Sequence, residues 1–138
     1  MRKRFLATVI AVIMLLTLCI TSAYALGYTG VGNFLTARGD YDQYSDTKTS
    51  AGNYAAVNTG ESYPNPGQLI GPTSLAWECV EMTEGRYVAD RRIGKNARDS
   101  AYIALEMRYV GAPYLFYIIN DSSVNATYGL TYSINATY

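Results

Sequence analysis

The chain opens with an apolar block before it changes to alternating apolar and polar positions. The block runs from Phe5 to Ile20, a basic cluster at Arg2 to Arg4 precedes it, and Ala23-Tyr24-Ala25 follows. Basic residues, an apolar stretch and a small-x-small cleavage pattern are the three parts of a secretory signal peptide. The pattern therefore predicts that residues 1–25 are a signal peptide, that cleavage falls before Leu26, and that the protein is secreted.

Two other interpretations of this block remain open. An uncleaved membrane anchor would need about 20 apolar residues, and this stretch is shorter and leads directly into a cleavage pattern. A lipoprotein would use Cys19, but Leu18 is large where lipoprotein processing generally requires a small residue. Both alternatives are therefore less favoured than the cleaved signal.

Downstream of the signal, apolar residues recur with a period of two, which is typical of strands with one buried face. Residues 75–93 predict a hairpin, because Leu75, Trp77 and Cys79 share one face of the first strand and a Gly-containing turn follows. Residues 100–109 alternate most clearly. Their apolar face consists of Ala101, Ile103, Leu105, Met107 and Tyr109, and Tyr102 lies on the opposite face.

Three further segments complete the expected fold. Residues 114–119 are apolar or aromatic throughout, which predicts a central strand covered on both faces. Residues 51–58 and 128–134 predict strands, and residues 59–67, with two prolines, predict a loop. Because no segment after the signal has a sustained helical period, we expect an all-β fold, an antiparallel β-sandwich or small barrel.

The expected organisation has three parts. Residues 1–25 are the signal helix, residues 26–50 an extended lead-in whose strand content the sequence leaves open, and residues 51–138 the β-sandwich domain. The 138 residues less the 25 of the signal leave 113, which fits one domain.

The charge balance also changes when the signal is removed. The whole chain has 11 basic and 11 acidic residues, but three basic residues leave with the signal, so eight basic against 11 acidic residues give a net charge of −3. Binding to phosphates requires a clustered basic face. We therefore expect no nucleic acid partner, and contact with a membrane only through the signal peptide during export.

Catalytic chemistry is restricted because the chain contains no histidine. Its absence excludes Ser-His-Asp and Cys-His sites and the commonest metal ligand. A carboxylate pair can hydrolyse glycosides, but Glu78 and Glu81 are expected on opposite faces of one strand. The sequence therefore predicts a protein that is not an enzyme and has no metal and no cofactor.

Cys79 is the one cysteine left after cleavage. On a predicted strand beside Trp77, it is expected to be a small buried apolar residue. The alternative is an intermolecular disulfide, since an odd cysteine in an oxidising compartment favours one.

Tyrosine dominates the aromatic residues, with 14 tyrosines against three phenylalanines and one tryptophan. Its ring suits half-exposed sheet faces, protein interfaces and platforms for sugars. Sheet packing explains most of them. The candidate binding residues are Tyr87, Tyr102, Tyr114 and Tyr117, with a cell-wall glycan or a surface protein as the partner.

Several short motifs are compatible with more than one interpretation. Arg38-Gly39-Asp40 matches the integrin-binding tripeptide, and Asn120, Asn125 and Asn135 begin Asn-x-Ser/Thr patterns. The segment at 123–128 recurs with one substitution at 133–138, either as strand composition repeating itself or as a duplicated strand edge or sorting tail.

The chain resembles small exported proteins of Gram-positive bacteria in its signal peptide, its Lys48-Thr49-Ser50 lead-in, its mid-chain hairpin and its closing strands at 105–109, 114–120 and 129–135. Some of those proteins look like lactococcin-type bacteriocins, which implies a β-sandwich, although this chain lacks their terminal tryptophan. The expected function is non-enzymatic binding at the cell surface or in the extracellular space. The alternative is a secreted bacteriocin-like antibacterial protein.

Overall fold

A computed structural model describes residues 28–50, 52–60, 68–103 and 109–137. The predicted signal peptide lies outside these ranges, as do residues 61–67 of the predicted loop and Leu105 and Met107 of the predicted strand. Within the described ranges, no helix combines the length and the apolar character that a membrane crossing requires.

The regular elements of the described ranges are β-strands. They are β1 (Thr29–Leu35), β2 (Asp40–Thr47), β3 (Tyr54–Asn58), β4 (Gln68–Ile70), β5 (Ser74–Glu81), β6 (Arg86–Gly94), β7 (Arg98–Tyr102), β8 (Pro113–Asn120) and β9 (Ala126–Ala136).

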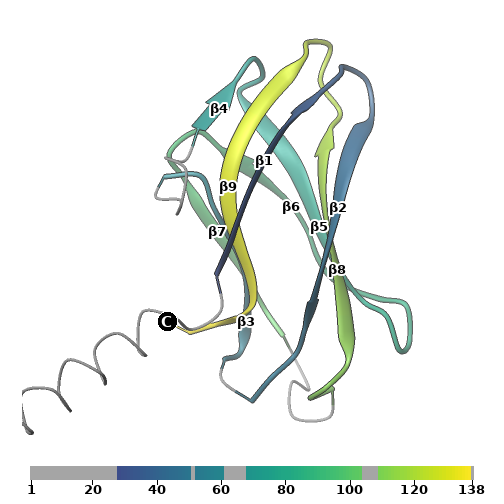
Figure 1. Ribbon diagram of the computed structural model, residues 1–138. Coiled ribbons are helices and arrows are strands. Elements are labelled where there is room, and N and C mark those ends of the chain that lie inside the picture. Colours follow the sequence, from purple (N-terminus) through teal and green to yellow (C-terminus); the bar gives the residue numbers. More distant parts are fainter. Residues whose placement is uncertain (1–27, 51, 61–67, 104–108, 138) are drawn as a thin grey trace, which may run out of the picture.

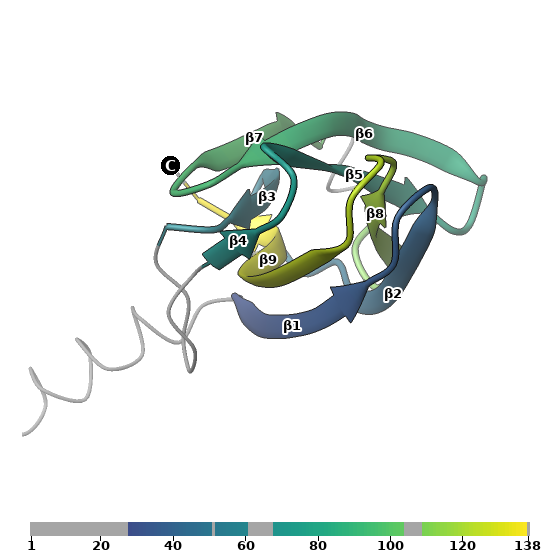
Figure 2. The ribbon, with the colours of Figure 1, turned by 90° about the horizontal axis from the view of Figure 1, so that it is seen from above.

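The strands form two antiparallel sheets that pack face to face (Figures 1 and 2). The five-stranded sheet has the order β1-β9-β3-β7, and β4 also pairs with β9. The four-stranded sheet has the order β2-β8-β5-β6. The prediction of an all-β antiparallel sandwich is therefore confirmed.

The segment 26–50, whose strand content the sequence left open, contributes one strand to each sheet. β1 pairs with β9, and β2 pairs with β8 along its whole length. Strand β2 carries few apolar residues because its inward positions form hydrogen bonds instead. The Tyr128 hydroxyl donates to the Asp42 carboxylate over 2.5 Å and lies 2.5 Å from the Tyr44 hydroxyl.

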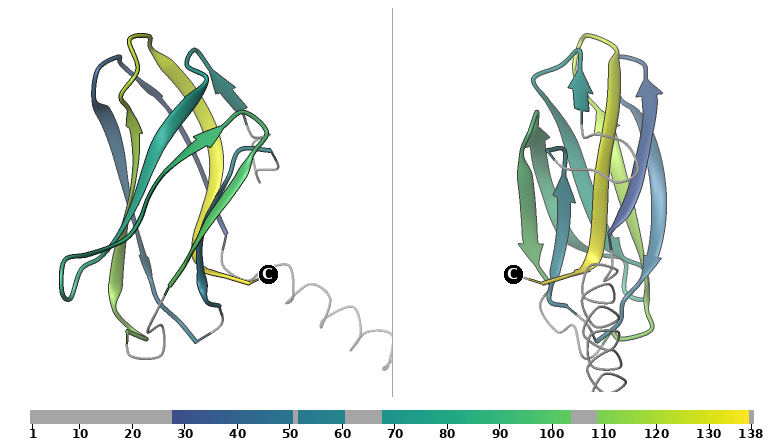
Figure 3. Two further views of the ribbon diagram at one scale, coloured as in Figure 1. Left: turned by 180° about the vertical axis from the view of Figure 1, so that it is seen from behind. Right: turned by 60° about the vertical axis from the view of Figure 1, so that its left-hand side comes forward.

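The predicted hairpin at 75–93 is confirmed as β5 and β6, which pair from Ser74 with Gly94 to Glu81 with Arg86. The turn uses Gly85 at a φ of 65°, where a residue without Cβ is least strained. A bulge between Cys79 and Val80 shifts the register near this turn. The end of the hairpin projects beyond the body of the sandwich (Figure 3).

Aromatic rings from both sheets fill the core. Trp77 stacks on Phe116 with centroids 5.7 Å apart, and Phe116 contacts Tyr132 of the opposite sheet at 4.8 Å. Trp77 is fully buried, as its predicted face requires, and its indole nitrogen donates to Asp99 over 3.0 Å. The indole N–H of Trp77, the largest side chain of the core, therefore has a hydrogen-bond acceptor, and the contacts between the rings join the two sheets.

The prediction that residues 114–119 are covered on both faces is wrong. β8 is central in its sheet, between β2 and β5. Its side chains alternate, however, with Tyr114, Phe116 and Ile118 buried and Leu115, Tyr117 and Ile119 only half-buried. The second set faces outward, where no described element covers the four-stranded sheet.

Lys48 and Asn135 connect the two sheets at one end of the sandwich. Lys48 is 1 % exposed, and its ammonium group donates to the carbonyl oxygens of Thr49 and Gly52 and to the Asn135 side chain. Asn135 also accepts from the Thr49 backbone at 2.8 Å and donates to the Thr47 carbonyl at 3.0 Å. The buried charge is therefore surrounded by acceptors.

The repeated segment has a related structural role in both copies. Asn125, just before β9, accepts a hydrogen bond from the Ala37 backbone before β2, and Asn135, near the end of β9, accepts one from the Thr49 backbone after β2. The two asparagines thus attach both ends of β9 to the segments that flank β2.

Candidate functional site

The outward face of the four-stranded sheet carries a row of polar and aromatic side chains. Residues paired across antiparallel strands project from the same face. Tyr117 is paired with Gln43 on one side and with Glu78 on the other, and Glu78 is paired with Asp90. A tyrosine ring at the centre of the sheet therefore lies between an amide and two carboxylates.

A shallow groove of about 490 Å³ crosses this face. Tyr41 and Tyr87, at opposite edges of the sheet, are 56 % and 63 % exposed, and the Tyr41 and Tyr117 rings lie 6.0 Å apart at 57°. We call this surface the tyrosine groove. Its lining residues are Gly39, Tyr41, Glu78, Val80, Met82, Gly85, Tyr87, Tyr117 and Ile119.

Glu78 and Asp90 give the tyrosine groove a local negative charge. Partial burial, and secondarily the neighbouring Asp90 carboxylate, raise the pKa of Glu78 above its ordinary value. Because burial and, secondarily, the like charge of Asp90 both disfavour the ionised carboxylate, the fold binds the Glu78 proton more tightly than the unfolded chain does. The stability that this proton contributes is complete below the unfolded pKa and is lost as the pH rises through the folded pKa.

We therefore expect Glu78→Gln to raise the free energy of unfolding at about pH 7 by about 0.2–0.5 kcal/mol, a small value because solvent screens the pair. At about pH 3.5, where the carboxyl group is protonated in both states, the gain should vanish. Urea unfolding at the two pH values measures both. Asp90→Asn should raise the free energy of unfolding by a similar amount. In the double variant the two gains should not add, and full additivity would contradict the repulsion between the two carboxylates.

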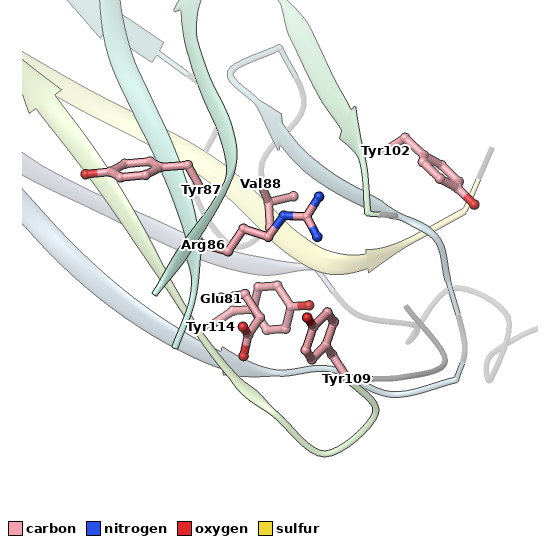
Figure 4. Close-up of a pocket in the computed structure, with 7 residues that line it drawn as sticks. All are labelled: Glu81, Arg86, Tyr87, Val88, Tyr102, Tyr109 and Tyr114. Carbon is pink, nitrogen blue, oxygen red and sulfur yellow. The ribbon is translucent and has the colours of Figure 1, made fainter. Parts of the chain in front are cut away.

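A second, smaller cavity lies at the end of the sandwich beside the β5–β6 turn. Its volume is about 70 Å³. Strand pairing places Tyr114 next to Glu81 and Glu81 next to Arg86 on the inner side of the sheet. We call this cavity the end pocket; its lining residues are Glu81, Arg86, Tyr87, Val88, Tyr102, Tyr109 and Tyr114 (Figure 4).

The four predicted tyrosines do not form one patch. Tyr117 lines the tyrosine groove, Tyr102 and Tyr114 line the end pocket, and Tyr87 lines both. Tyr114 is fully buried, so it belongs to the interior and not to an open face. Tyr102 is exposed at the end of β7, where its ring meets Tyr54 edge-on at 5.7 Å.

Sequence reasoning missed Tyr41, Asp90 and Arg86. Tyr41 lies in the segment whose strand content was open, and its place beside Tyr117 depends on the pairing of β2 with β8. Asp90 and Arg86 lie opposite Glu78 and Glu81 only because of the β5–β6 register, and a bulge shifts that register between the two pairs. The tyrosine content was the signal that could have found Tyr41.

Cys79 is a fully buried free cysteine on the inner face of β5. Burial raises the pKa of its thiol, which keeps it protonated and unreactive. A disulfide with a second chain would require this strand to separate from the core first.

The short motifs lie in different environments. Asn120 is fully buried and Asn135 is 7 % exposed, so their side chains are inaccessible in the folded protein, whereas Asn125 is exposed. Asp40, the first residue of β2 after the turn that holds Arg38 and Gly39, accepts hydrogen bonds from the backbone and hydroxyl of Thr36. Those hydrogen bonds, from the backbone first, lower the pKa of Asp40.

In the part of the chain that the structure describes, no group of three or more acidic or cysteine side chains is arranged to hold a metal ion. The fold and these two cavities define a small two-sheet β-sandwich protein with an aromatic groove on one outer face.

No family model matches the chain, and no curated protein does. Among solved structures, it is similar to PirA, with 9 % identity and a TM-score of 0.46 over 75 % of this chain and 91 % of that one. It is also similar to the carbohydrate-binding module CBM36 in complex with calcium and xylotriose (13 %, TM-score 0.43, 76 % and 88 %). A third is Peruvianin-I, a cysteine peptidase from Thevetia peruviana latex (12 %, TM-score 0.40, 82 % and 54 %). Likeness at this level carries no conclusion about ligand or activity.

Proposed function

We propose that this chain is an exported, non-enzymatic binding protein that holds a neutral glycan in the tyrosine groove. The observation that carries the proposal is the groove itself, in which Tyr41, Tyr117 and Tyr87 cross one sheet face with carboxylates beside them. Its volume of about 490 Å³ falls within the range of small-molecule sites. Export follows from the basic, apolar and small-x-small pattern at the N-terminus.

A glycan fits this surface better than a protein does. The cores of protein interfaces are depleted in charged residues, but Glu78 lies beside the central Tyr117 of this face and is paired with Asp90 on the edge strand β6, not with a cation. A protein would have to desolvate both carboxylates. Sugar hydroxyls can donate to them while the apolar faces of the sugar rings lie against tyrosine.

The charges of the face favour a neutral glycan. Arg92, which shares the outward face, is already paired with Asp121 at 2.6 Å. The carboxylates of Glu78 and Asp90 are left without a countercharge among the described ion pairs. Anionic sugars would be repelled, so uronic acid polymers are excluded as good ligands.

Binding to soluble β-linked hexasaccharides of glucose, xylose and N-acetylglucosamine, measured by isothermal titration calorimetry, tests the proposal. We expect at least one of these sugars to bind. Tyr117→Ala and Tyr41→Ala should each weaken that binding about tenfold, because each removes a stacking ring.

Phe34→Ala is the control. Phe34 is an aromatic residue of similar exposure, 53 %, but it lies on β1 in the other sheet, so its loss should leave binding unchanged. Failure of all three sugars to bind would overturn the proposed ligand. Release of shorter sugars, detected by chromatography after prolonged incubation, would contradict the non-enzymatic part.

A further inference from the structure

The end pocket contains a polar atom that the fold leaves unsatisfied. The Tyr114 hydroxyl is buried and has no hydrogen-bond partner among the described residues. A buried hydroxyl without a partner destabilises a fold by about 1–3 kcal/mol. Burial raises the pKa of Tyr114 to about 12, so the hydroxyl keeps its proton and can donate it.

Other polar side chains line the pocket together with that hydroxyl. Figure 4 shows the hydroxyls of Tyr109 and Tyr114 directed toward each other, with the Arg86 guanidinium above them. Glu81, paired with Tyr114 in the sheet, is 1 % exposed. Burial opposes its ionisation, but hydrogen bonds from Thr83 and Glu84 outweigh this and hold the pKa of Glu81 below its ordinary value.

The Arg86 side chain lies over the pocket (Figure 4). It is exposed, and it forms neither an ion pair nor a hydrogen bond in the described part of the chain, although Glu81 attracts it. A shift of the Arg86 side chain would expose the hydroxyl groups of Tyr109 and Tyr114 to a ligand. The Glu81 and Arg86 charges cancel, so the pocket suits a neutral ligand with paired donor and acceptor groups.

The end pocket and the tyrosine groove meet at Tyr87, which lines both. Tyr87 pairs with Val80 on the outer face, and the next pair along the strands, Glu81 with Arg86, belongs to the pocket. These two pairs point to opposite faces of the sheet, so a ligand in the groove would reach the pocket by passing around the edge strand β6 at Tyr87.

We propose that the end pocket binds the terminal sugar of the glycan, through two neighbouring hydroxyls that reach Tyr114, Glu81 and Arg86. This inference rests on the proposed function, and it adds that the protein recognises the end of the glycan. A volume of about 70 Å³, roughly that of two waters, admits one hydroxyl-bearing edge of a sugar ring and not a whole ring. The pocket lies at the end of the sandwich, where a terminal sugar can enter with its edge foremost.

Tyr114→Phe tests the proposal because it removes one oxygen and keeps the ring. With the hexasaccharide that binds best in the calorimetric screen, we expect affinity to fall about five- to tenfold. Urea unfolding of the free protein should show no loss of stability, since the hydroxyl removed has no partner there. A merely structural role would lower stability and leave affinity unchanged.

Tyr102→Phe is the matched control. It is the same substitution in another residue that lines the pocket, and its hydroxyl points away from the cavity (Figure 4). Its affinity should equal that of the unmodified protein.

Chain length supplies a second measurement. If the protein recognises the end of the glycan, the binding stoichiometry should be one protein per glycan molecule, both for a hexasaccharide and for a longer soluble polymer. Wild-type affinity in Tyr114→Phe, together with several proteins per polymer chain, would overturn the end pocket and leave binding in the groove intact. Absence of all sugar binding would instead overturn the proposed function.

Discussion

Replacing Trp77 by alanine should lower the free energy of unfolding by about 3–5 kcal/mol, the cost of truncating a large buried aromatic residue. Trp77 is fully buried, stacks on Phe116 and donates to Asp99. Its removal leaves a cavity between the sheets, and the Asp99 carboxylate loses the indole N–H as a donor. In a protein of ordinary stability this is a large fraction of the total.

Urea unfolding followed by far-UV circular dichroism measures this loss, because Trp77 is the sole tryptophan and its fluorescence disappears with it. Trp77→Phe should retain part of the stacking and lose about half as much stability. Ile70→Ala, at a position 60 % exposed on β4, should change stability by less than about 0.5 kcal/mol. A Trp77→Ala loss as small as that of Ile70→Ala would contradict the role of the aromatic core.

Lys48→Met should have a comparable effect, with a loss of about 3 kcal/mol or more. The methionine keeps an unbranched side chain that is one atom shorter, but it cannot donate a hydrogen bond. The carbonyl oxygens of Thr49 and Gly52 lose the ammonium donor inside the protein. The usual benefit of replacing a buried charge by an apolar group should not appear, because the acceptors around it are backbone atoms that remain.

Asn135→Asp distinguishes loss of the ammonium from loss of the amide. The carboxylate still accepts from Thr49 and Lys48 but no longer donates to the Thr47 carbonyl. We expect a smaller loss, about 1–2 kcal/mol. Lys95→Met, at an exposed lysine, is the control and should be neutral. Equal stability of Lys48→Met and Lys95→Met in thermal and urea unfolding would show that the buried network contributes nothing.

The alternation of apolar residues was sufficient to predict the fold class and the β5–β6 hairpin. Leu75, Trp77 and Cys79 are buried as their period of two requires. β2 escaped prediction because its inward positions include Asp42, whose burial is compensated by the Tyr128 hydroxyl from another sheet. A partner that is distant in sequence cannot be inferred from local periodicity.

The candidate site was only partly predictable for the same reason. Composition indicated that tyrosine was the residue type to follow, and Tyr87 and Tyr117 do line one groove. Which tyrosines share a face, however, depends on strand register and on the bulge at Cys79 and Val80. The run 114–119 gave no sign of which side faces outward, because both of its sides are apolar or aromatic.

The position of β9 determines when the sandwich can assemble. β1 and β4 have β9 as their partner strand in the described sheet, and β3 lies between β9 and β7 (Figure 1). Synthesis proceeds from the N-terminus, so β1 and β4 wait for the residues from Ala126 onward, whereas β3 can first pair with β7. Such long-range pairing is slow to form. A growing chain therefore has no complete five-stranded sheet to close over its core until its last strand is made. For the export that we propose, this delay would let the chain pass through a narrow channel before the sandwich closes.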